Sequence, residues 1–136
     1  NSKMVDIELQ VKNEYNIEQR STLYMSKNIR NEAVDNLFAA ILSLSNREEC
    51  YRFFEDICTV NELLSLSQRF EVASMLRAKR TYLEIAEHTG ASTATISRVN
   101  RSLNYGNDGY DMVFGRIPEL LEKIAKPEEE EKEPEI

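Results

Sequence analysis

Apolar residues recur at the spacing of α-helices along most of the chain, and polar segments separate them. The spacing predicts six helices, over about residues 29–44, 46–57, 60–79, 82–88, 93–103 and 109–125. Three of the predicted starts carry a capping box, in which a serine or threonine precedes a glutamate by three residues: Ser45 with Glu48, Thr59 with Glu62 and Thr81 with Glu84. Glycine, proline and β-branched runs are scarce, so the predicted fold class is all-α.

The first two predicted helices carry wide apolar faces and are joined by a short connection. One stripe of the first helix contains Ala33, Leu37, Ala40, Ile41 and Leu44, and the second helix is apolar at Cys50, Tyr51, Phe53, Phe54 and Ile57. A small chain cannot easily bury so much apolar surface alone. We therefore predict an obligate homodimer with interleaved N-terminal helices, and a compact monomer of six helices is the alternative.

The segment 82–101, with the sequence YLEIAEHTGASTATISRVNR, contains two short helices around a glycine turn. This is the layout of a helix-turn-helix. Ala86 is small enough to let the second helix approach, and Gly90 can adopt the positive φ of a sharp turn. Ser92 is a good N-cap. On the second helix the buried stripe is expected to be Ile96, Val99 and Leu103.

The opposite face of the second helix carries no large acidic side chain. Its exposed residues are predicted to be Thr93, Ala94, Thr95, Ser97, Arg98 and Arg101. Short side chains allow a helix to enter a major groove, hydroxyls and methyl groups can contact base edges, and guanidinium groups can reach phosphates. The face therefore predicts DNA binding, and an ordinary pair of packed helices is the alternative.

The net charge of −7 is distributed unevenly. The last ten residues, PEEEEKEPEI, hold six glutamates and one lysine, whereas residues 65–103 hold six basic and three acidic residues. A basic region on a mildly acidic body is compatible with DNA binding. We predict an N-terminal extension over residues 1–24, a helical DNA-binding domain over 25–125 and an acidic tail over 126–136.

Composition also excludes several classes of protein. No apolar run reaches the roughly 18–20 residues that span a bilayer, and no secretion signal is evident, so we expect a cytoplasmic protein. Cys50 and Cys58 lie eight residues apart on one predicted helix, too far for a disulfide, and are expected to be reduced core residues. With one histidine, no nucleophile beside a base, no phosphate loop and no metal spacing, we expect neither an enzyme nor a metal site.

The turn-rich segment Asn104–Tyr110 follows the motif. It is either a stiff connector that docks Tyr105 and Tyr110 onto the core, or a loop that contacts phosphates or a ligand.

Residues 49–110 carry a more specific pattern than a helix-turn-helix alone. They resemble the YerC/YecD-type branch of the Trp repressor family, most specifically in the pieces CTVNEL, SQRFEVA, TGASTATISRV and SLNYGNDGY. The resemblance implies an all-α fold, an intertwined dimer and an operator-reading helix-turn-helix. It makes 81–88 the supporting helix and 92–103 the recognition helix. It also places Lys79 and Arg80 near backbone phosphates. Thr81, at the start of the supporting helix, and Ser92, at the start of the recognition helix, are further candidates for DNA binding.

The founding member of that family is switched by tryptophan, and the resemblance allows its ligand site to be compared residue by residue. Its arginine on the recognition helix corresponds to Arg98, but the glycine that follows it is replaced here by Val99, whose side chain would occupy the space of the indole. A second arginine corresponds to Gln68. We therefore predict no tryptophan co-repressor and no other cofactor, and Arg98 is the only candidate for contact with an effector.

The prediction from the sequence is a dimeric, sequence-specific DNA-binding transcriptional regulator that acts as a repressor. The alternative is a helical protein–protein interaction module that does not bind specific DNA. In that case the helix-turn-helix is architectural and the acidic tail binds a basic partner.

Overall fold

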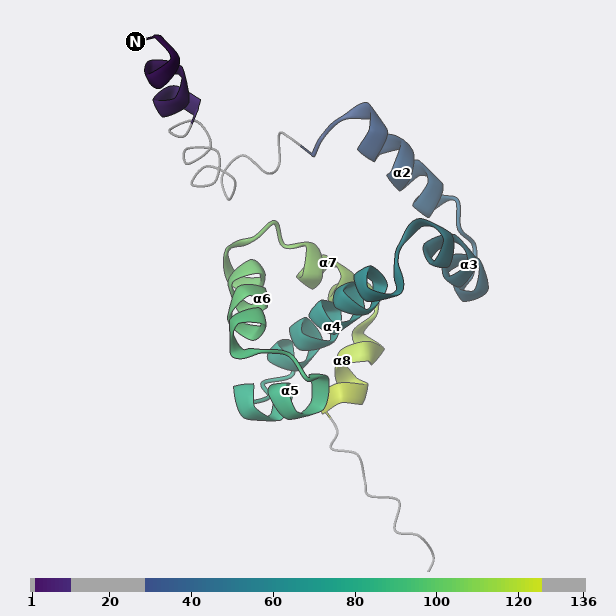
Figure 1. The fold of residues 1–136 in the computed structure, drawn as a ribbon. Coiled ribbons are helices and arrows are strands. Elements are labelled where there is room, and N and C mark those ends of the chain that lie inside the picture. The colour runs from purple at the N-terminus through teal and green to yellow at the C-terminus, as the bar shows by residue number, and fades with distance from the viewer. Residues whose placement is uncertain (1, 11–28, 126–136) are drawn as a thin grey trace, which may run out of the picture. The chain divides into compact units, whose positions relative to one another are not determined.

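The computed structural model describes residues 2–10 and 29–125, and Figure 1 shows its helices. After a helix over 2–10 come α2 (Glu32–Leu42), α3 (Arg47–Ile57), α4 (Val60–Arg77), α5 (Tyr82–Thr89), α6 (Thr93–Tyr105), α7 (Gly109–Arg116) and α8 (Pro118–Ala125). The described residues contain no strand, so the predicted all-α class is confirmed. The acidic tail and residues 11–24 of the predicted extension lie outside the described residues, and the predicted domain boundaries stay predictions.

The chain divides into two compact units, Asn1–Phe53 and Phe54–Ile136. In the second unit α4 lies at the centre and packs against α5, α6 and α8. The core consists of Val72, Ala73, Met75, Ile85, Ala91, Ile96, Val99, Leu103 and Phe114. The predicted apolar stripe of the recognition helix is therefore confirmed, because all three of its members are buried.

Capping explains most of the helix starts. Thr59 and Thr81 both form the predicted capping boxes with the glutamates three residues later. The hydrogen bonds from Thr59 lower the pKa of the Glu62 carboxyl. The predicted box of Ser45 and Glu48 is wrong by one residue. The side chain of Asn46 accepts a hydrogen bond from the backbone N–H of Glu49, and the Glu49 carboxylate accepts one from the N–H of Ser45.

The long helix α4 ends at Arg77, two residues earlier than predicted. The N–H of Lys79 donates to the carbonyl of Leu76, and the N–H of Arg80 donates to that of Met75. This is the Schellman pattern, which requires a left-handed residue at its penultimate position. Lys79 takes that position at φ 65°, although glycine is the usual residue there. The sequence lacks the glycine that would have signalled the end of the helix.

The last predicted helix, over 109–125, is wrong as one element, because it is broken at Ile117 into α7 and α8. Proline disfavours the helical conformation of the residue before it, and Ile117 adopts φ −130° and ψ 64°. Proline is well suited to the first position of a new helix, where its missing N–H costs no hydrogen bond. Pro118 therefore ends one helix and begins the next.

The segment Asn104–Tyr110 is only partly the connector that the sequence predicts. Tyr110 is half-buried, and its ring packs against those of Phe70 and Phe114, as predicted. Tyr105 is 86% exposed, so the prediction that it docks onto the core is wrong. The reason is register: Leu103, two residues earlier, points into the core, so Tyr105 points away from it. A Cβ atom at Gly106 would collide with the backbone carbonyl of Ser102, which makes glycine necessary at that turn.

Helices α2 and α3 contain no buried residue. Phe38 and Leu42 of α2 are 53% and 85% exposed, and Tyr51 and Ile57 of α3 are also exposed. Cys50 is exposed as well, so its prediction as a core residue is wrong, while Cys58 is half-buried and both thiols are free. Among the described residues these apolar side chains are therefore exposed, as the pattern of the sequence anticipates.

Among residues 2–10 and 29–125, no helix combines the length and apolar character needed to cross a membrane.

Candidate nucleic-acid interface

The turn between α5 and α6 is fixed by local hydrogen bonds. The N–H of Gly90 donates to the carbonyl of Ala86, and Gly90 adopts φ 71° as predicted. The hydroxyl of Thr89 donates to the carbonyl of Ile85 at 2.7 Å and accepts a hydrogen bond from the N–H of Ala91 at 3.1 Å. Because Ile85 and Ala91 are also buried, the angle between the two helices is set by both hydrogen bonding and packing.

The start of α6 is defined by Ser92, whose side chain accepts a hydrogen bond from the N–H of Thr95. The hydroxyl oxygens of Ser92 and Thr95 also lie 3.0 Å apart. The predicted N-cap is therefore confirmed. Thr95 was predicted to be exposed but is half-buried. Its hydroxyl lies against the Ser92 cap and is only partly accessible to a ligand on the outer face.

The outer face of α6 presents most of the side chains that the sequence nominates. Thr93, Ala94, Ser97, Arg98 and Arg101 are exposed. The ion pairs among the described residues are Arg77–Asp111, Arg80–Glu84 and His88–Glu71, so neither arginine of α6 is engaged in one. Arg98 thus has no carboxylate partner in the described part of the chain. Both guanidinium groups are open to an anion such as a phosphate.

The three residues before α5 differ in what they can contact. Lys79 is exposed. Arg80 is half-buried, donates a hydrogen bond to the carbonyl of Ile124 at the end of α8, and lies 3.9 Å from the carboxylate of Glu84. The hydroxyl of Thr81 accepts the N–H of Glu84. Arg80 therefore links α8 to the motif, a contact that was not predicted from the sequence. Of these three residues, Lys79 carries the positive charge that is exposed to solvent.

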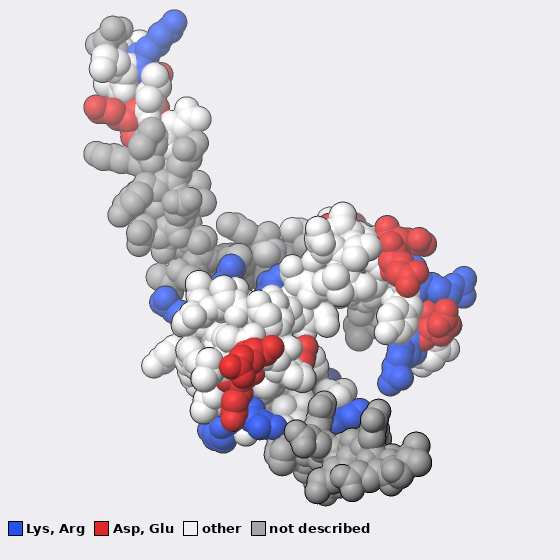
Figure 2. Space-filling model, turned by 60° about the horizontal axis from the view of Figure 1, so that its bottom comes forward, with Lys and Arg blue, Asp and Glu red and all other residues white. Residues whose placement is uncertain are grey.

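The charge on this part of the molecule is mixed. In the view of Figure 2 acidic side chains lie directly beside lysine and arginine side chains. Two of the three glutamates that the sequence places near the motif have local partners: Glu71 lies 2.9 Å from His88, and Glu84 belongs to the capping box of α5. Glu87 is exposed, so the positive surface is narrower than the net charge of the segment suggests.

Two exposed residues at the start of α5 were not nominated from the sequence. Tyr82 is 40% exposed and Leu83 is 69% exposed. Hydrophobic spacing could have predicted that Leu83 lies outside the core. At about 100° per residue, Leu83 lies about 200° around the helix from the buried Ile85.

The C-terminal end of α6 is held by Arg77 of α4. Its guanidinium makes a bidentate pair with Asp111 of α7, with Nε–Oδ1 at 2.7 Å and a second contact at 2.8 Å. It also donates to the carbonyl of Leu103 at 3.1 Å. The hydrogen bonds from Arg77 hold the pKa of Asp111 below its usual range. One side chain thus ties three helices together behind the exposed face.

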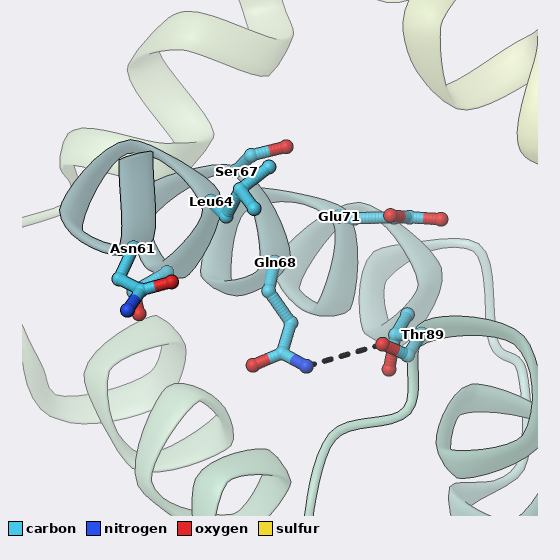
Figure 3. Close-up of a pocket in the computed structure, with 7 residues that line it drawn as sticks. Asn61, Leu64, Ser67, Gln68, Glu71 and Thr89 are labelled. Atoms are coloured by element: carbon cyan, nitrogen blue, oxygen red, sulfur yellow. Dashed lines mark hydrogen bonds between the residues drawn. The ribbon is translucent and has the colours of Figure 1, made fainter. Parts of the chain in front are cut away.

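A pocket of about 420 Å³ lies beside the N-terminal half of α4 (Figure 3). Its lining residues are Asn61, Leu64, Ser65, Ser67, Gln68, Glu71 and Thr89. The Gln68 amide points across it and donates a hydrogen bond to the carbonyl of Thr89. Arg98 does not line this pocket, and Val99 is 3% exposed within the core. Of the three positions compared with the tryptophan site, Gln68 alone lines this pocket.

No group of three or more histidine, cysteine, aspartate or glutamate side chains in the described segments could hold a metal ion.

Comparison with known proteins agrees with the geometry of the motif. The model of the Trp repressor protein family matches residues 32–118. The uncharacterized protein YerC of Bacillus subtilis (strain 168) is 60% identical over 91 residues, which cover 67% of this chain and 88% of YerC.

Two solved structures are similar in fold as well as in sequence. A TrpR-like protein from Eubacterium eligens ATCC 27750 is 71% identical, with a TM-score of 0.67, over 68% of this chain and 95% of that one. A candidate Trp repressor from Staphylococcus aureus is 58% identical, with a TM-score of 0.66, over 68% of this chain and 92% of that one. The chain therefore belongs to the Trp repressor family.

Proposed function

We propose that this protein is a sequence-specific DNA-binding repressor that acts as a homodimer through α5 and α6. Family membership gives the coarser function, a helical DNA-binding regulator rather than an enzyme. The observation that supports the finer proposal is the outer face of α6, where two arginines that form no ion pair with any described residue lie among short side chains. A repressor needs no catalytic group, because occupying a promoter is sufficient.

The dimensions of α6 suit a major groove. Its 13 residues extend about 20 Å at about 1.5 Å per residue, and the groove is about 12 Å wide and admits one helix. Ile96, Val99 and Leu103 hold the opposite side of α6 against the core. The exposed face is thus presented on a rigid support, as a recognition helix requires.

The exposed apolar surface of α2 and α3 favours a second copy of this chain as the partner. Members of this fold class that read DNA as dimers place two motifs on half-sites about one helical turn apart. Burial of Phe38, Leu42 and Tyr51 against a partner would remove apolar area from water. The proposed dimer would also bring two copies of α6 to one DNA duplex.

Substitutions on α6 test the proposal and separate affinity from specificity. Arg101→Ala is expected to weaken binding to all duplexes and to reduce the salt dependence by about one phosphate contact. Thr95→Ala or Arg98→Ala is expected to change preference among sequences, by about 1–3 kcal/mol where a base contact is lost. The measurement is binding of duplexes selected from a random pool, followed by fluorescence anisotropy at several salt concentrations.

Arg116→Ala is the matched control, because it removes an equal charge from an exposed position on α7. Circular dichroism verifies that each variant retains its helices. If the three variants of α6 bind DNA as the wild type does, α6 is not the DNA-reading surface. Retention of a protein partner in the absence of any DNA binding would instead favour the interaction module.

We also propose that tryptophan is not the effector. The proposal is supported by Val99, a buried side chain at the position compared with the ligand-site glycine, and by Gln68, whose amide already bonds to Thr89 where a guanidinium would be needed. A bound carboxylate is best held by a bidentate arginine, and only Arg98 is available for that role. Calorimetric titration of the protein with tryptophan should therefore detect no binding in the micromolar range. A micromolar dissociation constant would overturn this proposal without affecting the assignment of α6.

A further inference from the structure

We propose that Leu83 is a specificity-determining residue that reads the C5-methyl group of a thymine at the edge of each half-site. The inference rests on the proposed DNA-binding function and assigns a contact outside the recognition helix. Its starting observation is that Leu83 is 69% exposed, although it lies within the DNA-reading motif.

The position of Leu83 on α5 directs it away from the core. Ile85 is fully buried in the core, and the half-buried Ala86 packs against it. Leu83 lies about 60° around the helix from Ala86 and on the outer side. It therefore lies on the exposed side of the supporting helix without taking part in the core.

Leu83 also lies at the correct end of α5. It is the second residue of that helix, and α5 packs against α6. The first turn of α6 carries Thr93 and Ala94, both exposed. Leu83 thus adds an apolar side chain at the start of α5 to the exposed methyl groups at the start of α6.

The surroundings of this surface favour the edge of a DNA base as the occupant. Arg98 continues the line of Ala94 along α6, and the exposed Lys79 lies just before α5. Lys79 is a cation suited to a phosphate at the edge of a groove, and Arg98 is suited to the edge of a base within it. Among the exposed edges of the four base pairs, thymine alone presents a methyl group in the major groove.

The acidic residue on the same face agrees with this orientation. Glu87 follows Leu83 by four residues, about 6 Å farther along the axis of α5. An approach of the first turn of α5 towards DNA keeps the Glu87 carboxylate at the more distant end. The predicted contact is therefore apolar, local to the start of α5, and independent of the phosphate contacts.

The test combines removal of the methyl group from DNA with removal of the leucine side chain. The probe is the preferred duplex selected from a random pool by the wild-type protein, with each thymine replaced in turn by deoxyuridine. For the wild type, at least one replacement should weaken binding about three- to fivefold, the effect of one buried methyl group. Leu83→Ala should bind the original duplex more weakly, by at least the same factor, and should be insensitive to deoxyuridine at that position.

Leu83→Met is the matched control, because it retains an apolar side chain of similar volume and should retain sensitivity to the methyl group. Both substitutions are at an exposed helical position and should preserve the fold. The inference is wrong if no thymine shows a methyl effect, or if Leu83→Ala remains as sensitive as the wild type at every thymine. Failure of the wild type to select any sequence would instead overturn the proposed function, and this inference with it.

Discussion

Replacing Ile96 with alanine is expected to lower the free energy of unfolding by about 2–5 kcal/mol. Ile96 is fully buried in the middle of the stripe that holds α6 against the core. The substitution removes apolar contacts and leaves a cavity, because the neighbouring α4 and α5 are held by their own packing and capping. The change is measured by equilibrium unfolding in urea at one fixed protein concentration, since association would make stability depend on concentration.

Ser97→Ala is the control for this experiment, because it changes the adjacent exposed residue of the same helix. Its effect on stability should stay within about 0.5 kcal/mol. A loss of less than 1 kcal/mol for Ile96→Ala would show that α6 is not held by this stripe. The two variants together separate the inner face of α6, which carries stability, from the outer face, which is proposed to carry DNA binding.

The parts of the fold that could be predicted from the sequence depend on residues close together in the chain. The capping boxes of Thr59 and Thr81 need only a partner three residues away. The positive φ of Gly90 and the N-cap at Ser92 are likewise local. Periodicity within one helix was also sufficient to identify the buried stripe of α6, and with it the outer face that holds the candidate site.

The features that escaped prediction depend on contacts between distant segments. Arg80 was expected near phosphates, but its guanidinium reaches the carbonyl of Ile124, forty-four residues later. The bidentate contact of Arg77 with Asp111 joins residues thirty-four apart. Composition cannot indicate which arginine of a basic segment forms hydrogen bonds within the protein and which remains free to bind DNA. The break at Ile117 is different, because the proline that follows it was a local signal that the apolar pattern outweighed.

Exposure of Cys50 has the same origin as the exposure of Phe38 and Leu42. Each belongs to a helix that has an apolar face but no buried residue in the part of the chain that the structure describes. A sequence pattern identifies an apolar face that is expected to be buried. It does not show whether the residues that bury this face belong to the same chain or to another copy. An apolar face on α2 left without a cover would be a site of association. This reasoning supports the homodimer more directly than the helix-turn-helix does.

Phe38→Asp should convert the proposed dimer into single chains and lower operator affinity by about 10²–10⁴-fold, because the two motifs would no longer bind one duplex together. Phe38 is 53% exposed on the apolar side of α2. A carboxylate there must be desolvated in the dimer but stays in water in the single chain, which favours dissociation. Analytical ultracentrifugation gives the mass, and anisotropy with the selected duplex gives the affinity.

Asn36→Asp supplies the matched control, since it adds the same charge to α2 about 200° around the helix from Phe38, at an exposed position. It should retain the mass of two chains and wild-type affinity. A wild-type protein with the mass of one chain would contradict the dimer itself. A Phe38→Asp variant that remains dimeric with unchanged affinity would place the interface elsewhere. Loss of both dimer and affinity by Phe38→Asp alone would link the apolar face of α2 to DNA binding by α6, although no residue of α2 needs to contact the duplex.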